Sequence, residues 1–283
     1  MDKEILRSEI LPWSTENNDA RAVVKTGAGV RRNYPADDFS DLDIELYFQD
    51  YAPYAAHSDW FEAFGEVWVY LPLFVDGNFP SRLVIYEGGA KVDFLLYDVA
   101  DLKRRAQWQM LPDVYQRGFK IHLDKDDIAT HILPSPFAAP TPKIPSVDEF
   151  NFVVREFWFE AFHVAKYLRR GDLWPAKFRD RALQDNLLRL MEWHAQTVRD
   201  ENEIWFQGRF LKEWTDAETY ATLPTVFAGY DSAASWQALH NMAALFRRLS
   251  KEVAQVLGFD YPEKLDENMS RFIDSLFNRR DNN

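Results

Sequence analysis

Two aspartates, Asp41 and Asp43, flank Leu42 in a segment that otherwise reads as a buried strand, LDIELYF. Residues two apart in a strand point to the same face, so the two carboxylates would lie side by side. Like charges this close repel, and a cation between them removes the penalty. Mg²⁺ prefers oxygen ligands and keeps room for substrate phosphates, so the pair indicates a metal site. An aspartate that merely faces water where the strand begins explains the DLD pattern equally well.

Two further features favour the metal site, and the first is a small-residue turn. Gly27, Ala28 and Gly29 come directly after a β-branched segment, Ala20–Lys25, and before the aspartate pair. Such a turn can present backbone N–H groups to phosphate oxygens without a side chain in the way. Glycine pairs also mark ordinary turns, so the turn alone is a weak signal.

The second feature is Asp93, which lies among apolar neighbours in the segment KVDFLL. A buried charge without a partner is costly. If this segment pairs beside the strand of Asp43, Asp93 completes a cluster of three carboxylates. Three acids around one or two metal ions can clamp a triphosphate and help to activate an attacking hydroxyl. The turn, the aspartate pair and the later aspartate together are typical of nucleotidyl transfer.

The elements that must position these residues are strands in the first half and helices in the second. Alternation and β-branched residues predict strands at 20–25, 42–48, 66–74, 82–86 and 91–96, with a hairpin turn at 87–90. Short helices are expected before the first strand and around 58–64. Helical periodicity predicts long amphipathic helices at 147–169, 177–198, 232–257 and 265–277, the first with a capping box at Ser146 and Glu149.

Five prolines separate the two halves, in PSPFAAPTPKIP, and no helix or central strand can run through them. We therefore expect an α+β protein with three parts. Residues 1–133 form a mixed β-sheet with flanking helices, 134–145 form a proline-rich linker, and 146–283 form an α-helical, substrate-binding domain.

Composition limits the possible partners. The chain of 283 residues has a net charge of −12, which disfavours nucleic acid, and it has no cysteine, which excludes disulfides and thiolate chemistry. The N-terminus lacks the pattern of a signal peptide, and no apolar run is long enough for a membrane span. We expect a cytoplasmic protein that binds neither nucleic acid nor membrane. Nothing in the sequence indicates an oligomeric state.

The sequence resembles a known family along nearly its whole length. GAGVRRNYPADDFSDLDIELYF, WFEAFGEV and EGGAKVDFLL are similar to the aminoglycoside 6-adenylyltransferases, which include the streptomycin adenylyltransferases. In the second half, EFWFEAFHVAKYLRRGDL and SWQALHNMAALFRR follow that family's C-terminal domain in order and spacing. The resemblance implies the nucleotidyltransferase fold, ATP with Mg²⁺, and transfer of AMP to a hydroxyl of an aminocyclitol antibiotic such as streptomycin, a reaction that confers antibiotic resistance.

The resemblance also implies roles for individual residues. Asp41 and Asp43 would bind metal, and Asp93 would be a third ligand or the base for the acceptor hydroxyl. Lys166 stands where the family has a lysine of its own and would contact phosphate. Helical periodicity puts Glu156 and Glu160 on one face of the same helix, where they would bind a cationic acceptor or, alternatively, simply face solvent.

One departure from the family falls in the turn. The family usually has Gly-Ser-Arg where this chain has Gly27-Ala28-Gly29, so a hydroxyl and a positive charge expected near the triphosphate are absent. Backbone N–H groups would still meet phosphate, and Arg31 or Arg32 could reach in from nearby. The departure leaves an alternative open, a non-catalytic or re-purposed relative that binds nucleotide or another small cationic acceptor.

Overall fold

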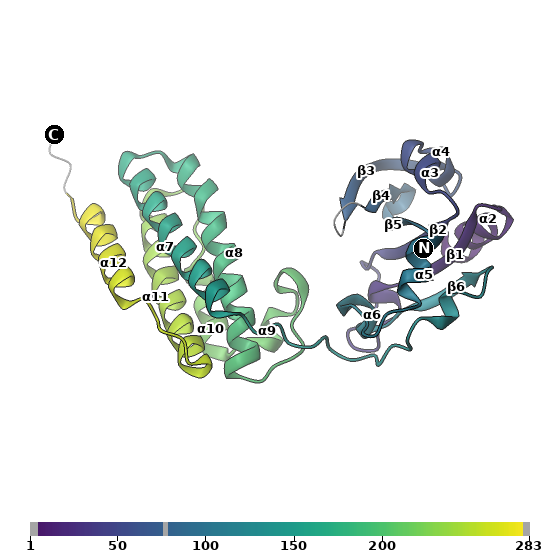
Figure 1. Cartoon of the computed structure of the whole chain (residues 1–283). Coiled ribbons are helices and arrows are strands. Elements are labelled where there is room, and N and C mark those ends of the chain that lie inside the picture. Colours follow the sequence, from purple (N-terminus) through teal and green to yellow (C-terminus); the bar gives the residue numbers. More distant parts are fainter. Residues whose placement is uncertain (1–4, 76–78, 280–283) are drawn as a thin grey trace. The chain divides into compact units, whose positions relative to one another are not determined.

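The computed structural model describes residues 5–75 and 79–279, and the chain divides into two units, 1–140 and 141–283. A six-stranded mixed sheet forms the centre of the N-terminal unit (Figure 1). The division falls within the proline-rich stretch, and residues 133–146 have no regular secondary structure. The strands are β1 (Ala20–Lys25), β2 (Leu42–Phe48), β3 (Val67–Val75), β4 (Phe79–Tyr86), β5 (Lys91–Asp98) and β6 (Lys120–Asp124).

The order of strands in the sheet is β3-β4-β5-β2-β1-β6. β2 and β5 are parallel neighbours, and every other adjacent pair is antiparallel. The predicted pairing of the Asp93 strand beside the Asp43 strand is therefore confirmed. The predicted hairpin is confirmed as well: β4 joins β5 through a short 3-10 turn, Glu87–Gly89, in which both glycines have positive φ. β6, at the edge beside β1, was not predicted.

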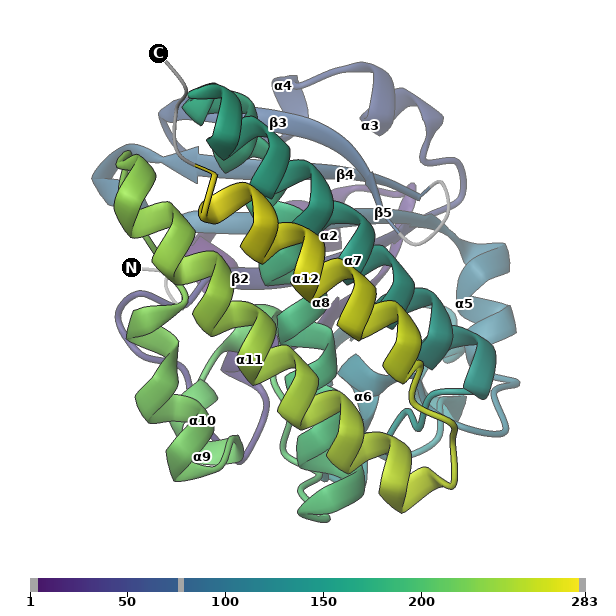
Figure 2. The ribbon, with the colours of Figure 1, turned by 90° about the vertical axis from the view of Figure 1, so that its left-hand side faces the viewer.

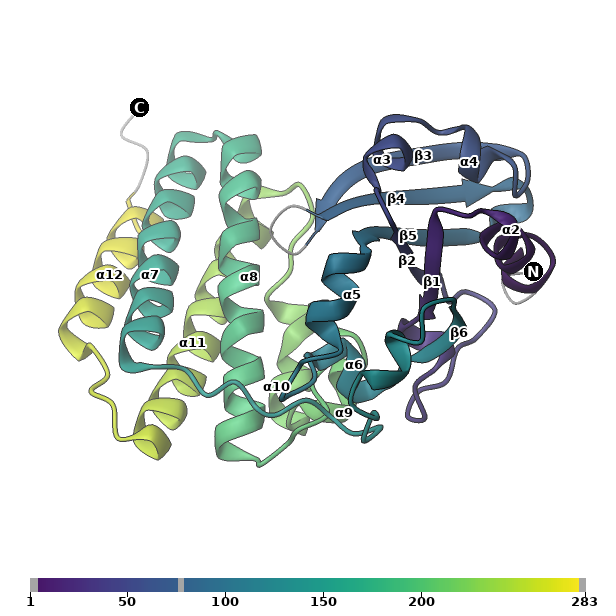
Figure 3. The ribbon, with the colours of Figure 1, turned by 45° about the vertical axis from the view of Figure 1, so that its right-hand side comes forward.

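Each face of the sheet is covered by apolar side chains from short helices. Leu42, Ile44 and the other even-numbered residues of β2 pack with residues of the N-terminal helices η1 (Leu6–Ile10) and α2 (Leu11–Glu16) and of α4 (Asp59–Glu62). The opposite face packs against α5 (Val99–Arg105) and α6 (Asp113–Arg117), and α5 contacts both β2 and β5 (Figure 3). The remaining short helix of this unit is α3 (Ala52–Ala56).

The face of β2 that carries Asp43 continues into a buried polar cluster around Glu45. The Glu45 side chain is 4% exposed and forms an ion pair of 2.8 Å with Arg105 of α5. Tyr47 donates a hydrogen bond of 2.6 Å to the same carboxylate oxygen, and Tyr115 of α6 donates another. The Arg105 guanidinium also lies 4.1 Å from the centre of the Tyr97 ring. This cluster fixes α5 and α6 against β2, the strand that begins at the aspartates.

The C-terminal unit is built from four long helices. They are α7 (Val147–Arg170), α8 (Leu173–Val198), α11 (Ser232–Leu257) and α12 (Glu263–Phe277). Each of these matches a predicted helix, and the capping box of Ser146 and Glu149 is confirmed. α8 begins at Leu173, before the predicted start at residue 177. Pro175 permits this because it lies in the first helical turn, where a backbone N–H has no hydrogen-bond partner within the helix. α7 lies beside α8, α11 and α12 (Figure 2). In the described parts of the chain, the helices are all too short or too polar to cross a membrane.

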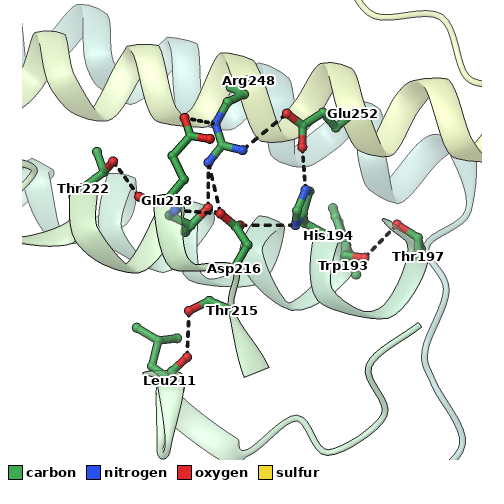
Figure 4. A network of polar contacts seen from close by, with 11 residues as sticks. Trp193, His194, Thr197, Leu211, Thr215, Asp216, Glu218, Thr222, Arg248 and Glu252 are labelled. Atoms are coloured by element: carbon green, nitrogen blue, oxygen red, sulfur yellow. Dashed lines mark hydrogen bonds and ion pairs between the residues drawn. The ribbon is translucent and has the colours of Figure 1, made fainter. Parts of the chain in front are cut away.

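A polar network ties the short helix α10 (Ala217–Thr222) to the long helices α8 and α11 (Figure 4). His194 of α8 is buried, and its Nε2 lies 2.6 Å from a carboxylate oxygen of Glu252. Arg248, one turn before Glu252 on α11, donates to the Thr219 hydroxyl and lies 4.0 Å from Asp216, the N-cap of α10. The loop between α8 and α11, which also carries α9 (Leu211–Trp214), is thereby attached to the bundle.

Replacing Arg105 with methionine should destabilise the N-terminal unit. The change keeps most of the side-chain volume but leaves the buried Glu45 carboxylate without its cation, and breaking a buried ion pair costs about 3–5 kcal/mol. We expect a loss near the lower end, about 3 kcal/mol, because Tyr47 and Tyr115 still donate to Glu45. Urea denaturation followed by circular dichroism measures it.

Arg104→Met is the matched control. The Arg104 side chain is 65% exposed, whereas that of its partner Asp101 is 7% exposed and also accepts a hydrogen bond from the backbone N–H of Asp98. Loss of the exposed arginine should therefore cost less than about 1 kcal/mol. Equal losses in the two variants would show that Glu45 does not depend on Arg105.

Candidate active site

The register between the two parallel strands places the predicted acidic residues at one end of the sheet. Asp43 of β2 is directly opposite Asp93 of β5, and Asp41 immediately precedes β2. The flanking partners Leu42 and Val92 are fully buried on the other face of the sheet. The side chain of Asp93 is 18% exposed and that of Asp41 is 43% exposed. The three carboxylates therefore lie where the sheet opens from its core to solvent.

Lys91 contacts two of these carboxylates at once. Its Nζ lies 2.6 Å from Asp41 Oδ2 and 2.9 Å from Asp93 Oδ2. Nζ is also 2.8 Å from Asp93 Oδ1, but only the contact with Oδ2 has hydrogen-bond geometry, and Oδ1 is buried without a hydrogen-bond partner. Sequence reasoning missed Lys91, although it stands two residues before Asp93 in the same strand and so shares its face.

The glycine turn packs directly against Asp43. Gly27 has φ +66°, a left-handed conformation that disfavours other residues, and a Cβ added to it would lie 1.8 Å from Asp43 Oδ2. The N–H of Thr26 donates a 3.1 Å hydrogen bond to the carbonyl of Asp43, which holds the start of the turn to β2. Only glycine fits at position 27, and the turn backbone and the Asp43 carboxylate border the same space.

The charges around Asp43 change its affinity for protons. Burial, together with the charges of Asp93 and Asp41, raises the pKa of Asp43 to about 6. Burial likewise raises the pKa of Asp93, and the hydrogen bond and charge of Lys91 offset only part of this effect. Burial acts to lower the pKa of Lys91, but its bonds to the two carboxylates outweigh burial and raise it. The site holds more negative charge than its own cations neutralise.

The two arginines that follow the turn differ in their surroundings. The positive charge of Arg31 acts to lower the pKa of Asp43, so this residue lies close enough to influence the carboxylate. The guanidinium of Arg32 lies 4.2 Å from the centre of the Phe137 ring, outside the turn. Of the two, Arg31 is the one associated with the aspartates.

A pocket of about 530 Å³ opens beside this end of the sheet. It is lined by the end of β1, the turn, the segment before β2 and the 3-10 turn before β5. The lining residues are Lys25, Gly29, Ala36, Asp37, Asp38, Phe39, Ser40, Asp41, Leu42, Gly88, Gly89, Ala90 and Lys91. The pocket thus combines acidic side chains with two lysines and with glycine backbone.

The donor chemistry of the three aspartates fits a divalent cation. Carboxylate oxygens are the ligands that Mg²⁺ prefers, and Asp93 Oδ1 has an unused hydrogen-bonding capacity. Within residues 5–75 and 79–279, however, no three His, Cys, Asp or Glu side chains converge into a ready-made metal site. The cation that contacts Asp41 and Asp93 in this arrangement is the Lys91 ammonium.

Three further predicted site residues lie on α7 in the helical unit. Glu160 is 8% exposed and accepts hydrogen bonds of 2.9 and 3.2 Å from Arg179 of α8. Glu156 is half-buried, and Lys166 Nζ lies 4.7 Å from the centre of the Phe162 ring. The polar face predicted for this helix therefore includes an internal ion pair. The contacts of Glu156, Glu160 and Lys166 with acceptor and phosphate stay predictions.

Comparison with known proteins gives one family. The family model for streptomycin adenylyltransferase matches residues 1–276. The chain is 24% identical to the aminoglycoside 6-adenylyltransferase of Bacillus subtilis (strain 168), covering 94% of this chain and 95% of the relative. It is 25% identical to that of Campylobacter jejuni, covering 93% and 92%. A crystal structure of an aminoglycoside 6-adenyltransferase from Bacillus subtilis aligns with 22% identity over 98% of both chains, with a TM-score of 0.46.

Asp43→Asn should stabilise the metal-free protein at high pH. The pKa of Asp43 in the folded protein, about 6, lies above its ordinary value of 3.8, so the folded state holds this proton more tightly than the unfolded state. Wild-type stability therefore falls as pH rises from about 4 through about 6, by up to about 3 kcal/mol. Urea denaturation in EDTA at pH 4 and pH 8 should show the variant more stable at pH 8 only.

The exposed Asp38, which lines the same pocket, provides the control. Asp38→Asn should leave the pH dependence of stability unchanged. If the free energies of unfolding of Asp43→Asn and wild type differ by the same amount at both pH values, ionisation of Asp43 does not destabilise the folded protein.

Proposed function

The chain belongs to the streptomycin adenylyltransferase family, and we propose on that premise that it transfers AMP from ATP to a hydroxyl of an aminoglycoside. Membership makes it an enzyme of the nucleotidyltransferase class. Streptomycin is the acceptor we favour, and Mg²⁺ is the metal ion. In a cell that meets the drug, this reaction would confer resistance.

In the proposed reaction the acceptor hydroxyl oxygen attacks the α-phosphorus of ATP. A new P–O bond forms, the bond from the α-phosphorus to the bridging oxygen breaks, and pyrophosphate leaves. The hydroxyl proton goes to a carboxylate, for which Asp93 is our candidate, or to water. Asp41, Asp43 and Asp93 would hold Mg²⁺, which supplies neutralisation of charge on the phosphates.

The observation that carries this proposal is the contact between the glycine turn and Asp43. A backbone able to bind phosphate and a carboxylate able to bind metal border the same space, with Asp93 opposite. Positioning and charge stabilisation supply most of the catalysis in phosphoryl-group transfer, and both depend on such a constellation. The turn residues Gly27, Ala28 and Gly29 would meet the triphosphate with their backbone.

For the acceptor we propose contacts from the helical unit. A net charge of −12 suits a polycationic aminocyclitol, and Glu156 and Glu160 are acidic side chains on one helix. Glu160 would share its carboxylate with Arg179, so Glu156 is the freer of the two to take an ammonium group. Lys166 is proposed as an additional contact to phosphate.

The alternative of a non-catalytic relative is not favoured. The match to the family extends over residues 1–276, and the curated relatives are named as adenylyltransferases. The three carboxylates that the reaction needs are all present in the chain. The departure at the turn concerns phosphate binding, and it does not remove the groups that hold metal or move the proton.

Incubation with ATP, Mg²⁺ and a panel of aminoglycosides headed by streptomycin tests the proposal. Mass spectrometry should show one acceptor that gains a single adenylyl group, with pyrophosphate released. Asp43→Asn should lose the product, because it removes a charge from the metal site while the fold is retained. Product formed at the wild-type rate by Asp43→Asn would sink the assignment of the site.

Lys91→Met should increase the affinity of the site for a divalent cation in the absence of nucleotide. The Lys91 ammonium now contacts Asp41 and Asp93, so a metal ion must compete with it. The variant removes a positive charge that lies next to the carboxylates, so binding of Mn²⁺ should tighten roughly tenfold or more.

Electron paramagnetic resonance of free Mn²⁺ during titration gives the dissociation constant directly. Lys103→Met, which removes the same charge from an exposed position on α5, should leave that constant unchanged. Weaker Mn²⁺ binding in Lys91→Met would show that this lysine supports the cation site and does not compete with it.

A further inference from the structure

Gly27 and Gly29 are glycines for different structural reasons. Gly27 has positive φ, whereas Gly29 does not, so the backbone at Gly29 accepts an L-residue. A side chain at this position would instead have to displace the end of Lys25. A Cβ added to Gly29 would lie 2.3 Å from both Cε and Nζ of Lys25. The end of the Lys25 side chain therefore occupies the space in which a side chain at position 29 would start.

Lys25 brings a positive charge to the turn from the preceding strand. Lys25 is the last residue of β1, it is 7% exposed, and it lines the same pocket as Gly29 and Lys91. Its backbone pairs with Ile44 of β2, and the end of its side chain lies beside Gly29 of the turn. Burial and the charges of Lys120 and Lys25 lower the pKa of His122 on β6, a further sign of positive potential at this end of β1.

We propose that Lys25 binds the triphosphate of ATP, and that Lys25 and Gly29 together replace a cationic side chain on the turn. This inference rests on the proposed function. Gly29 leaves the space, and Lys25 puts its ammonium there. The resemblance described above implies an arginine at the position of Gly29, and on this proposal Lys25, two positions before Gly27, supplies a positive charge in its place.

The make-up of the pocket agrees with a metal-complexed polyphosphate as the ligand. Lys25 and Lys91 are the two basic side chains of its lining, and Asp37, Asp38 and Asp41 are acidic. A bare anion would be repelled by those acids, whereas a polyphosphate that carries a divalent cation uses both kinds of charge. The backbone of Gly29 adds N–H donors of the kind that bind phosphate oxygens.

Isothermal titration with Mg·ATP and with adenosine tests the role of Lys25. Lys25→Met keeps the side-chain length and removes the charge. Loss of a charge-assisted hydrogen bond of about 1.5–3 kcal/mol should weaken Mg·ATP binding roughly tenfold to a hundredfold. Adenosine has no phosphate, so its affinity should stay at the wild-type value. Lys103→Met, a charge removed from the surface of the same unit, should change neither.

A second pair of variants tests the exchange between the two positions and does not depend on the stability of one substitution. Gly29→Arg alone should weaken Mg·ATP binding, because the new Cβ would displace the Lys25 ammonium from its place beside the turn. Lys25→Ala alone should weaken it through loss of the charge. The double variant Lys25→Ala/Gly29→Arg should bind more tightly than either single variant, because the arginine then has both the space and the role.

The outcomes separate this inference from the proposed function. If wild-type protein binds Mg·ATP and Lys25→Met binds it equally well, the inference is wrong and the function stands. If the double variant binds Mg·ATP no more tightly than Lys25→Ala, an arginine at position 29 does not take over the role of Lys25, and that part of the inference is wrong. Equal losses for Mg·ATP and adenosine in Lys25→Met would assign Lys25 a structural role. Wild-type protein that binds no Mg·ATP would overturn the function and the inference together.

Discussion

Backbone pairing between the parallel strands β2 and β5 holds Asp43 opposite Asp93, and the other features of the site are arranged around that pair. The register is fixed by the opposite face, where Leu42 and Ile44 are buried with their partners on β5. A slip of one residue would turn Asp43 toward the apolar core and Leu42 away from it. The hydrophobic pattern of two strands therefore sets the geometry of the carboxylates, although it takes no part in the chemistry.

Once the carboxylates are gathered, the charge they carry governs what surrounds them. Burial and mutual repulsion raise the pKa of Asp43 to about 6, so the site by itself is short of positive charge. The Lys91 ammonium offsets part of this shortage in the nucleotide-free protein by contacting Asp41 and Asp93. In the proposed reaction a divalent metal ion would bring positive charge to the carboxylates, and the nucleotide would bring phosphates that need cations. The same lysine could then pass from carboxylate to phosphate within one pocket, which both Lys91 and Asp41 line.

Local patterns in the sequence predict most of the fold and the acidic half of the site. Alternation finds β2 and β5, helical periodicity finds the four long helices, and the lone Asp93 points to its partners. β6 was missed although its sequence, KIHLD, alternates polar and apolar residues, because five residues at the sheet edge give only a short pattern. Lys91 could have been found from its spacing to Asp93, since both lie on one face of β5. The contact of Lys25 with Gly29 could not, because it depends on how the chain turns back after β1.

That contact changes how the turn itself should be interpreted. The resemblance to the family implies that Gly27-Ala28-Gly29 lacks a hydroxyl and a charge, which would weaken a phosphate site. On our proposal Lys25 supplies the charge, because this residue ends the strand that enters the turn and its ammonium lies where a side chain of Gly29 would begin. A binding turn is thus defined by the space it encloses and by every side chain that reaches that space. Gly29 is best explained as the residue that leaves room for a neighbour, whereas Gly27 is required by its own backbone and by Asp43.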